Sequence, residues 1–561
     1  MGYFYNNARL AAAVSVAGTL AISTPAQANN PVLEPVVDGG SVSASDPSAS
    51  VSALQTALIA PKATSDEARV HYESNAYRGV WIDASGDEAK AQALLGALNR
   101  AGEHALPSAK YNMPILRAAL DGARSGDAAA VAAAELALTN AFLSYARDLT
   151  SGLLEPRRID RDLHVFPERP EASALLAGMM RTTDAESYLD ALAPRHPHYD
   201  GLKKELGALV NLGLSDAWGP EAPQGRSIRL GQRGPRVEAI RARLAAMGDY
   251  DPAVPAADPA EYDEGLEAAV RSFQKRHGLN DDGVIGKRTV AAMNRSAAYR
   301  AGQIVVNMER LRWLNRDLGH RHVLVNQADY NVKVVDGDRI LFNERVVIGK
   351  SRKHRTPEFS DEMTHLVFNP TWHVPYSIAS KEILPKLQED PEYLAKKNMR
   401  LLARGGGEFD ATLTDWSLYS ASDFPFVVKQ RPGGGNALGR VKFMFPNQFN
   451  IYLHDTPSKK LFKKDARAFS HGCVRVQDPM ELARVLLSPQ QPDTSPYIDG
   501  ILNRRKERRV NLEAPVPVHL TYRTAWVDED GTHQFRADVY GRDARVLAAL
   551  RAAGVDAAPE S

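Results

Sequence analysis

The chain has 561 residues, of which 44% are hydrophobic and 24% charged, the usage of an ordinary globular protein. This length excludes a single hydrophobic core, and about 100 to 200 residues per domain predicts three or four domains. A formal net charge of +1 argues against nucleic acid as the main partner, because phosphate binding depends on many uncompensated basic groups.

Residues 1–28 have the order of a cleavable secretory signal peptide. Arg9 and the amino terminus precede an apolar stretch, Leu10 to Ile22, which leads to the small residues of Ala26-Gln27-Ala28. The stretch is shorter than the roughly 20 apolar residues that span a bilayer, and no later segment has transmembrane character. We therefore expect an exported protein, tethered to the membrane if the signal is retained. A buried N-terminal helix is the alternative.

Residues 29–64 are rich in Pro, Ser, Ala and Gly without periodicity, which predicts a flexible linker. From residue 65 to residue 218 the apolar residues take a helical spacing, as in the stripe of Ala91, Leu94, Leu95 and Leu98. The alanine-rich stretch 127–146 has the same character. The region 65–218 is therefore predicted to be an all-helical scaffold domain without chemistry of its own.

A compact unit follows at residues 225–296, with helical stripes that begin at Val237 and Leu266. It contains the runs Ala269-Val270-Arg271-Ser272-Phe273-Gln274, His277-Gly278-Leu279 and Asp282-Gly283-Val284-Ile285-Gly286. Together these runs resemble the peptidoglycan-binding type 1 module, which implies a small three-helix domain. A spacer bundle that binds nothing is the alternative, because a fold alone does not establish a ligand.

After residue 301 the apolar period changes to two. Val323 and Val325, like Val332 and Val334, alternate with polar neighbours as strand residues do. Asp336-Gly337 then indicates a hairpin. The region 301–525 is therefore predicted to be mostly β.

Residues 377–436 interrupt this β pattern with helical character and are predicted to be an inserted helical capping subdomain. The glycine triplets 405–407 and 433–435 lack the Lys-Ser/Thr of a nucleotide loop, so they are interpreted as hinges of this insertion. Residues 526–561 are predicted to be a C-terminal tail.

Cys473 is the only cysteine of the sequence and lies in Ser470-His471-Gly472-Cys473-Val474-Arg475. A lone thiol in an exported protein cannot form an internal disulfide, so reactivity is its most economical explanation. With an ordinary pKa of about 8.5 it needs a basic neighbour to attack as thiolate. His471 shares a face with Cys473 if the segment is extended, and His454 ends the strand-like run 449–454.

A helix start is predicted after the thiol, in Asp478-Pro479-Met480-Glu481, with Asp478 as N-cap and Pro479 at the first helical position. Cys473 precedes this helix by a turn or more. We therefore expect its activation to come from histidine and not from a helix dipole.

The pairing of His454 with the run around Cys473, 19 positions on, resembles the L,D-transpeptidase catalytic domain, or YkuD domain. The large Gram-negative, YcbB-like branch is similar in three further runs: Asn307-Met308-Glu309-Arg310, Asn369-Pro370-Thr371-Trp372-His373-Val374-Pro375 and His454-Asp455-Thr456-Pro457. The resemblance implies a periplasmic, multidomain α+β protein. Its parts would be a helical scaffold, a peptidoglycan-binding domain and a mostly-β catalytic domain with an inserted helical capping subdomain.

The resemblance also implies residue roles. Cys473 would be the nucleophile and His454 the general base, its ring oriented by the carbonyl of Asp455. Main-chain N–H groups would form an oxyanion hole around Ser470, His471, Gly472 and Cys473. The substrate pocket would be shaped by Trp372, Tyr452 and Arg475, with Arg475 pairing with a carboxylate or holding the loop. Many relatives have Gly where this chain has Asp455, which leaves the local backbone shape open, and both aromatic residues could instead be core residues.

The implied reaction is acyl transfer from a peptidoglycan tetrapeptide stem through a thioester, with release of D-alanine and formation of a 3–3 cross-link. Water or a protein lysine as acceptor would make the protein an L,D-carboxypeptidase or a protein-anchoring enzyme. Carbapenems would acylate Cys473, and penicillins would be poor inhibitors. No cofactor or metal is implied. Other cell-wall synthesis enzymes are candidate partners, and nucleic acid and nucleotides are not expected.

Two alternatives stay open at this level. A zinc hydrolase could use His454, Asp455, His471 and Cys473 as ligands, although a short-spaced signature such as His-Glu-x-x-His is missing. A wall-binding protein whose β-domain has lost activity would keep the fold without the chemistry. An inert core cysteine is disfavoured by the polar neighbours of Cys473.

Overall fold

The computed structural model describes residues 47–60, 63–83, 85–214, 217–253, 256–314 and 317–556. The expected signal peptide and the first part of the expected linker lie outside these residues. The remainder of the linker contains a helix, α1 (Pro47–Ile59), in place of the flexible chain that was predicted. Leu54 and Leu58, one helical turn apart, are buried in the core of the scaffold. Two well-spaced leucines therefore order a segment whose composition alone is typical of a linker.

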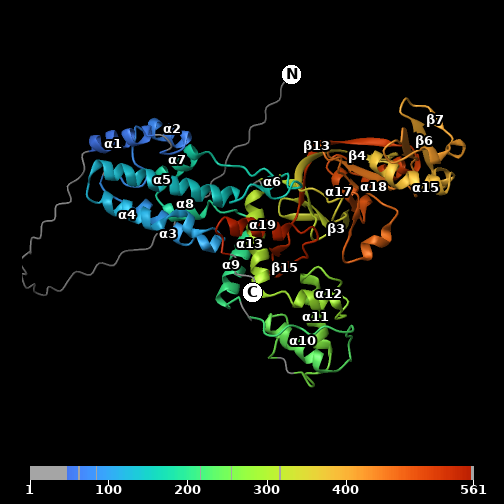
Figure 1. Ribbon diagram of the computed structural model, residues 1–561, viewed down its shortest axis with the longest axis horizontal. Coiled ribbons are helices and arrows are strands. Elements are labelled where there is room, and N and C mark those ends of the chain that lie inside the picture. Colours follow the sequence, from blue (N-terminus) through green and yellow to red (C-terminus); the bar gives the residue numbers. More distant parts are fainter. Residues whose placement is uncertain are drawn as a thin grey trace, which may run out of the picture. The chain divides into compact units, whose positions relative to one another are not determined.

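The scaffold domain is helical, as predicted (Figure 1). Its α-helices are α1, α2 (Asp66–Ser74), α3 (Ala89–Asn99), α4 (Met113–Ala123), α5 (Ala128–Ser151), α6 (Pro156–Ile159), α7 (Ala172–Arg181), α8 (Ala185–Asp190) and α9 (Pro197–Asn211). Helix α5 contacts α1, α3, α4 and α7. It is long and apolar enough to cross a membrane. Its buried side chains, among them Leu138, Phe142 and Leu149, instead pack into the scaffold core.

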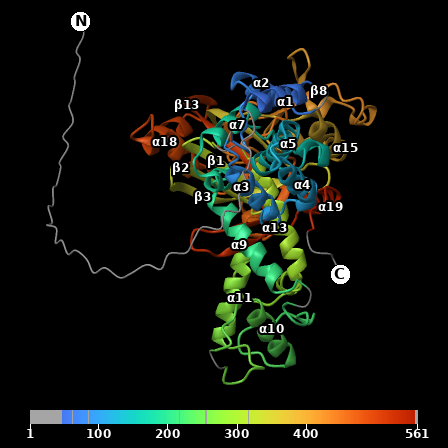
Figure 2. The same cartoon turned by 90° about the vertical axis from the view of Figure 1, so that its left-hand side faces the viewer.

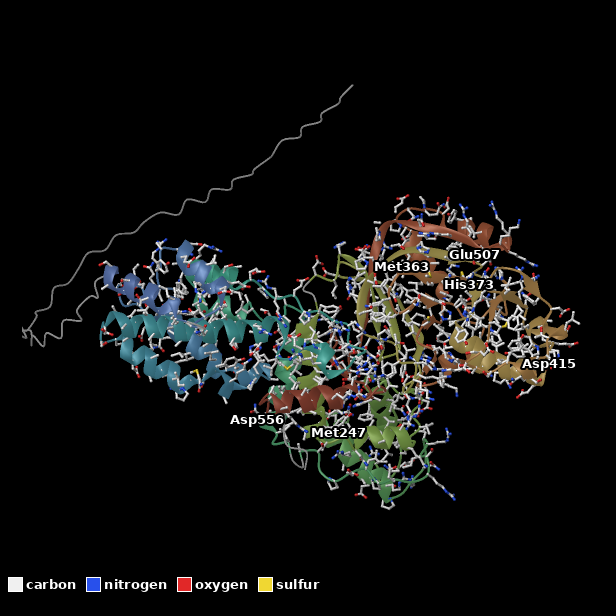
Figure 3. All side chains as sticks on the ribbon, turned by 45° about the horizontal axis from the view of Figure 1, so that its top comes forward. Met247, Met363, His373, Asp415, Glu507 and Asp556 are labelled. Atoms are coloured by element: carbon white, nitrogen blue, oxygen red, sulfur yellow. The ribbon has the colours of Figure 1, made fainter. Side chains whose placement is uncertain are left out.

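The unit predicted to bind peptidoglycan is built from three helices, as the resemblance implied: α10 (Pro235–Ala246), α11 (Glu264–Arg276) and α12 (Lys287–Met293). Figure 2 shows α10 and α11. The predicted stripe residues Val237, Leu244 and Phe273 form the core of this unit. Met247, labelled in Figure 3, packs against that core at the end of α10.

The predicted catalytic region contains a nine-stranded sheet in the order β11-β3-β12-β10-β9-β4-β13-β1-β2, and β2 also pairs with β3, so the sheet closes on itself. The strands are β1 (Arg321–Asn326), β2 (Asn331–Asp336), β3 (Arg339–Gly349), β4 (Phe359–Phe368), β9 (Val441–Met444), β10 (Leu453–His454), β11 (Ala468–Ser470), β12 (Val474–Val476) and β13 (Arg508–Thr521). The predicted alternation is confirmed, because Val323, Val325, Val332 and Val334 are all fully buried. The core also receives α17 (Pro479–Leu487) and α18 (Thr494–Asn503).

The insertion is mixed α/β, whereas a helical subdomain was predicted. Its helical stretch consists of α14 (Tyr376–Ile378), a π-helical turn (Ala379–Ile383), α15 (Leu384–Glu389) and α16 (Tyr393–Lys396). A second sheet, in the order β5-β8-β6-β7, joins β5 (Trp372–His373), β6 (Met399–Ala403), β7 (Glu408–Phe409) and β8 (Phe426–Gln430). In β8 alternate residues are buried, and Phe426 and Val428 contribute to a core of the insertion's own.

The described part of the expected C-terminal tail is folded, so that prediction is wrong up to residue 556. It forms β14 (Ala525–Val527), β15 (His533–Phe535) and α19 (Arg542–Ala552). Val546 and Leu550, one turn apart on α19, are fully buried against α13 (Ala297–Trp313) and α9. This apolar stripe gives α19 a place in the core.

Candidate active site

The register of β10 and β12 sets the face on which the candidate residues lie. The two strands are parallel neighbours with Leu453 opposite Val474 and His454 opposite Arg475. Leu453 and Val474 are fully buried in the sheet core. Because side chains alternate along a strand, His454 and Arg475 lie on the other face. Tyr452 and Cys473, two residues before them, share that face, and the N–H of Val474 donates to the Tyr452 carbonyl at 3.1 Å.

Lys442 joins this face from β9 and was missed in the sequence analysis. It lies opposite His454 in the antiparallel β9–β10 pair. Its Nζ is 5.8 Å from the ring centroid of Tyr452. The signal that could have found it is a lysine between two fully buried residues, Val441 and Phe443, which marks the outward position of a strand.

His454 is held by one hydrogen bond. Its Nδ1 lies 2.5 Å from the Asp455 carbonyl oxygen, so Nδ1 carries the proton and Nε2 is left to accept one. The orienting carbonyl is the one that the resemblance implied. Burial, followed by the charge of Arg475, lowers the pKa of His454 to about 3. The imidazole is therefore neutral at physiological pH.

Asp455 is accommodated by the loop before β9. Its carboxylate accepts hydrogen bonds from the Arg440 N–H at 2.8 Å and from Lys459 Nζ at 2.8 Å. Gly439 adopts a φ of +62°, and a Cβ at this position would overlap the Asp455 carboxylate. The aspartate therefore replaces the glycine of many relatives without losing the carbonyl that His454 needs.

Cys473 lies between β11 and β12 and is partly buried. Its Sγ is 3.6 Å from the Asn450 carbonyl oxygen, to which the thiol donates. Burial raises the pKa of Cys473 to about 11, although Tyr452 and Arg475 favour the thiolate. Within the described residues the recorded hydrogen bond of Sγ is to Asn450 and not to His454. The pair is therefore a neutral thiol and a neutral imidazole on one face.

The turn before β12 is fixed by Ser470 and Gly472. Ser470 Oγ donates to the Cys473 carbonyl at 2.6 Å and accepts from the Gly472 N–H at 3.1 Å. Gly472 has a φ of +123°, which side chains rarely adopt, and its carbonyl accepts from Thr356 Oγ1 at 2.7 Å. The Gly472 N–H is thus occupied, whereas no partner is recorded for the Cys473 N–H among the described residues. Within the described part of this turn, the N–H of Cys473 is therefore left as a free donor.

His471 faces the insertion. Its Nε2 is 2.5 Å from Glu382 Oε1, on the π-helical turn, and its ring centroid is 4.6 Å from that of His354. Trp372 belongs to β5 beside His373, which is labelled in Figure 3, and packs against the core of the insertion. No described contact joins Trp372 to Cys473 or His454, so its role in the pocket stays a prediction.

Two cations on the candidate face have no acidic partner among the described residues. Arg475 is half-buried, and its Nε is buried without a hydrogen bond. Lys442 is also half-buried, and no ion pair involves it in the described part of the chain. Burial lowers the pKa of both groups. Such cations suit a substrate that carries carboxylates.

The proposed zinc ligands are not gathered into one site. His471 is bonded to Glu382, and the Asp455 carboxylate is bonded to Arg440 and Lys459. Across the described residues no group of three or more His, Cys, Asp or Glu side chains has a geometry that could hold a metal.

Comparisons with known proteins agree with this division of the chain. Family models match a scaffold domain at residues 66–206, a peptidoglycan-binding domain at 233–293 and the L,D-transpeptidase catalytic domain, YkuD, at 320–510. A Haemophilus influenzae protein described as an L,D-transpeptidase is 35% identical over 245 residues, which cover 44% of this chain and 48% of that protein. The chain thus spans about half the length of this curated relative.

A second curated relative is the N-acetylmuramoyl-L-alanine amidase CwlM of Mycobacterium tuberculosis, 35% identical over 89 residues, which are 15% of this chain and 22% of that protein. Solved L,D-transpeptidase structures are similar to 54% of the chain. The Xylanimonas cellulosilytica structure is 15% identical and covered in full, with a TM-score of 0.17. The Stackebrandtia nassauensis structure is 14% identical and 96% covered, with a TM-score of 0.22. On the family models, this chain contains an L,D-transpeptidase catalytic domain of the YkuD family, preceded by a scaffold domain and a peptidoglycan-binding domain.

Proposed function

We propose that the protein is an L,D-transpeptidase that forms 3–3 peptidoglycan cross-links through a thioester on Cys473. The observation that carries this proposal is the shared face of β10 and β12, inside the matched catalytic domain. A thiol, an imidazole with Nε2 available and an unpaired guanidinium occupy that face. These are the groups that an acyl transfer on an anionic peptide requires.

The first half-reaction acylates the enzyme. Cys473 Sγ attacks the carbonyl carbon of the third residue of a tetrapeptide stem, and its proton passes to His454 Nε2. The tetrahedral oxyanion accepts a hydrogen bond from the Cys473 N–H. The C–N bond to the terminal D-alanine then breaks, and the imidazolium returns its proton to the departing amine. The stem remains as a thioester.

The second half-reaction transfers the stem to an acceptor. The side-chain amine of meso-diaminopimelate in another stem attacks the thioester and gives a proton to His454. The C–S bond breaks, and the sulfur is reprotonated. Arg475 and Lys442 pair with stem carboxylates in both steps. Water as acceptor gives L,D-carboxypeptidase activity, and a protein lysine gives anchoring of a protein to the wall.

The proposed location is the periplasm, reached through the signal peptide at residues 1–28. There the peptidoglycan-binding domain would keep the catalytic domain near its polymeric substrate, and other cell-wall synthesis enzymes would supply donor stems. Carbapenems, as acylating agents of the same thiol, are proposed as inhibitors.

The test is incubation of the protein without residues 1–28 with purified sacculi, followed by digestion and mass spectrometry. We expect 3–3 dimers and free D-alanine, none of either with Cys473→Ala, and a rate about 10²- to 10⁴-fold lower with His454→Gln. Lys463→Gln, at an exposed cation outside the face, is the control and should keep full activity.

Other outcomes separate the alternatives. Tripeptide stems without dimers would identify a carboxypeptidase. Wild-type turnover that stops with chelator and returns with added zinc would overturn the cysteine mechanism in favour of a zinc hydrolase. Wild-type protein that binds sacculi and changes no stem would indicate a wall-binding protein.

A further inference from the structure

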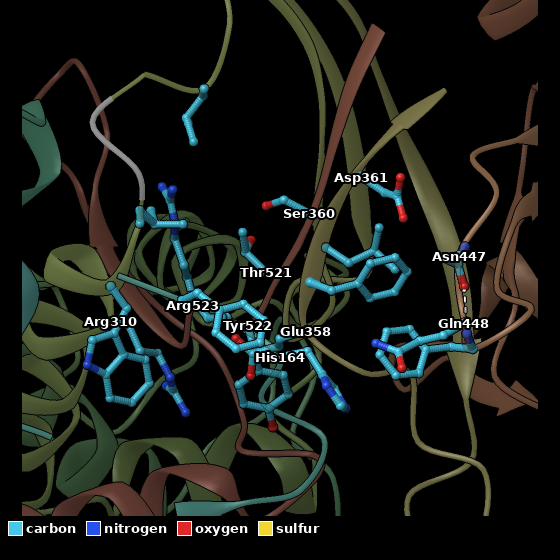
Figure 4. Close-up of a pocket in the computed structure, with 18 of the residues that line it drawn as sticks. His164, Arg310, Glu358, Ser360, Asp361, Asn447, Gln448, Thr521, Tyr522 and Arg523 are labelled. Atoms are coloured by element: carbon cyan, nitrogen blue, oxygen red, sulfur yellow. Dashed lines mark hydrogen bonds between the residues drawn. The ribbon is translucent and has the colours of Figure 1, made fainter. Parts of the chain in front are cut away.

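A cavity of about 510 Å³ is shown in Figure 4. Its walls come from residues 164–166, the end of α13, the start of β4, the loop 446–449 and the end of β13. The first of these segments is anchored to the catalytic sheet, since the His164 N–H donates to the Glu358 carbonyl at 2.8 Å. The volume falls in the range of small-molecule sites, about 300–1,000 Å³.

Arg523 is the unusual residue of this cavity. It lines the cavity and is only 6% exposed, and its Nε and Nη2 have no hydrogen-bond partner among the residues that the structure describes. Its Nη1 lies 3.4 Å from His196 Nε2. No acidic side chain within the described residues forms an ion pair with it. Burial lowers the pKa of Arg523 to about 10, so the group still carries its charge at neutral pH.

The groups near Arg523 supply no compensating charge. Burial, followed by the charge of Arg523, lowers the pKa of His196 to about 2 and that of His198 to about 4. Burial also lowers the pKa of His322 and His519, and Arg523 contributes in both cases. These four imidazoles are therefore neutral near pH 7. A buried charge without a partner is costly and is retained where it serves a ligand or a specific contact.

A second guanidinium lines the same cavity. Arg310 is 5% exposed and donates from Nη1 to Asp543 at 2.6 Å, but its Nε and Nη2 are unpartnered. Of the acidic groups in the lining, Glu358 is paired with Arg542 at 2.9 Å, which leaves Asp361 at the rim of β4. Among the charged lining residues, Arg523 is therefore the cation for which the described residues supply no acidic partner.

The remaining walls are apolar. Phe449 packs against Phe359 with ring centroids 4.9 Å apart and against His164 at 4.3 Å. Trp313 and Leu520 complete this wall. An anion alone would satisfy Arg523 but would leave these aromatic and aliphatic surfaces in contact with water.

We propose that this cavity binds a small amphiphilic anion, in which a carboxylate or phosphate group is joined to an apolar body. The anionic group pairs with the guanidinium of Arg523, assisted by that of Arg310. The apolar body lies against Trp313, Phe359 and Phe449. Its lining does not include Cys473, His454 or Arg475, so the proposal does not rest on the proposed acyl transfer.

The test uses two fluorescent probes of similar shape on the whole protein. The anionic probe is 8-anilinonaphthalene-1-sulfonate, and N-phenyl-1-naphthylamine is its neutral counterpart. We expect the wild type to bind the anionic probe and Arg523→Gln to bind it about ten- to a hundredfold more weakly, the effect of losing a charged hydrogen-bonding partner. Arg523→Lys should retain part of the affinity, and the neutral probe should bind all three proteins alike.

Competition identifies the anionic group. Decanoate and decyl phosphate should each displace the anionic probe from the wild type, with the tighter competitor naming the carboxylate or the phosphate class, and decanol should displace it poorly. Arg484→Gln, at an exposed arginine paired with Glu481, is the matched control and should leave probe affinity unchanged.

Three results would overturn the proposal. The anionic probe could fail to bind the wild type, could bind Arg523→Gln as tightly, or could be displaced equally by decanol. Thermal melting tests whether Arg523→Gln is folded. Removal of an unpaired buried charge should leave the melting temperature of Arg523→Gln equal to that of the wild type or higher. A lower melting temperature together with unchanged competition by decanoate would make Arg523 a structural residue and refute its role as ligand.

Discussion

At the scale of single residues, the proposed nucleophile and its proposed base are both neutral before substrate binds. Burial raises the pKa of Cys473 to about 11 and lowers that of His454 to about 3. At pH 7 a thiol with this pKa is ionised in about one molecule in ten thousand. Proton transfer from Sγ to Nε2 must therefore accompany attack on the substrate and cannot precede it as a stable ion pair.

This neutral pair predicts the pH dependence of thiol alkylation. A raised pKa makes thiolate scarce at every pH below it, so the rate of modification of Cys473 by iodoacetamide should rise about tenfold per pH unit between roughly pH 7 and pH 10. Labelling followed by intact-mass spectrometry gives the rate. His454→Gln should show the same slope, because the imidazole holds no proton from the thiol at rest.

A thiolate–imidazolium pair would behave differently. The rate would then level off above about pH 6 in the wild type, and His454→Gln would lose this plateau. Such a profile would contradict the assignment of neutral groups.

At the scale of secondary-structure elements, the local patterns were predictable and the long-range pairings were not. The start of α17 follows directly from its sequence, since Asp478 accepts from the Glu481 N–H at 3.2 Å. The sheet of the insertion does not, because β5 pairs with β8 across nearly sixty residues and each strand is short. The helical spacing of apolar residues around Leu384 predicted a helical insertion, and the strands of this segment were therefore not expected.

Some residues of the candidate site could likewise be predicted from the sequence, and others could not. The run Ser470–Arg475 and His454 lie within one motif, whose residue types alone indicate the chemistry. Lys442 reaches the site through the register of β9, and Glu382 reaches it through the fold of the insertion. Neither position carries a local signal of function. Burial shifts the pKa values of Cys473 and His454. Its extent depends on the folded chain and cannot be predicted from the motif.

The contact between Glu382 and His471 predicts coupling of the insertion to the catalytic turn. Glu382→Ala should raise amide hydrogen exchange about two- to fivefold in residues 376–389 and 470–473, because a partly exposed side-chain contact of this kind contributes about 0.2–1 kcal/mol. Hydrogen–deuterium exchange with mass spectrometry measures both segments.

Glu389→Ala is the matched control for this coupling. Glu389 lies on the same helical stretch, but its partner is Lys386, away from the catalytic turn. The control should leave exchange at residues 470–473 unchanged. Equal exchange in Glu382→Ala and the wild type at this turn would show that the insertion is not coupled to it through this contact.

At the scale of the whole molecule, α13 carries buried charges that join distant parts of the chain. Glu309 pairs with Arg312 at 2.8 Å with both side chains fully buried, and Glu309 also accepts from the Leu154 N–H at 2.8 Å. Arg310 pairs with Asp543 of α19 at 2.6 Å. Loss of one member of such a pair costs about 3–5 kcal/mol, because it strands the other charge. These pairs fix α13 against the scaffold and the C-terminal segment.

Buried histidines are spread over the same interior. Burial lowers the pKa of His104 to about 3, as it does for His196, His198 and His454. Each of these rings is neutral in the folded protein but binds a proton below its ordinary pKa of 6.5 once the chain unfolds. Glu135 acts in the opposite sense, because burial raises its pKa to about 7 and it binds a proton only in the folded state between that pH and 4.5. The contribution of Glu135 to the pH dependence of stability therefore cancels that of about one buried histidine.

The protein is therefore expected to lose stability as the pH falls from about 6.5 to about 4.5, where the unfolded chain takes up more protons than the folded one. Each buried histidine contributes up to about 1.4 kcal/mol per pH unit to this slope. Urea unfolding at a series of pH values measures the slope. His104→Gln should flatten it by about that amount whatever its effect on absolute stability, whereas His320→Gln, whose side chain is 82% exposed in the wild type, should leave it unchanged. A free energy of unfolding that is constant over this range, or a His104→Gln slope equal to that of the wild type, would contradict the assignment of neutral buried histidines.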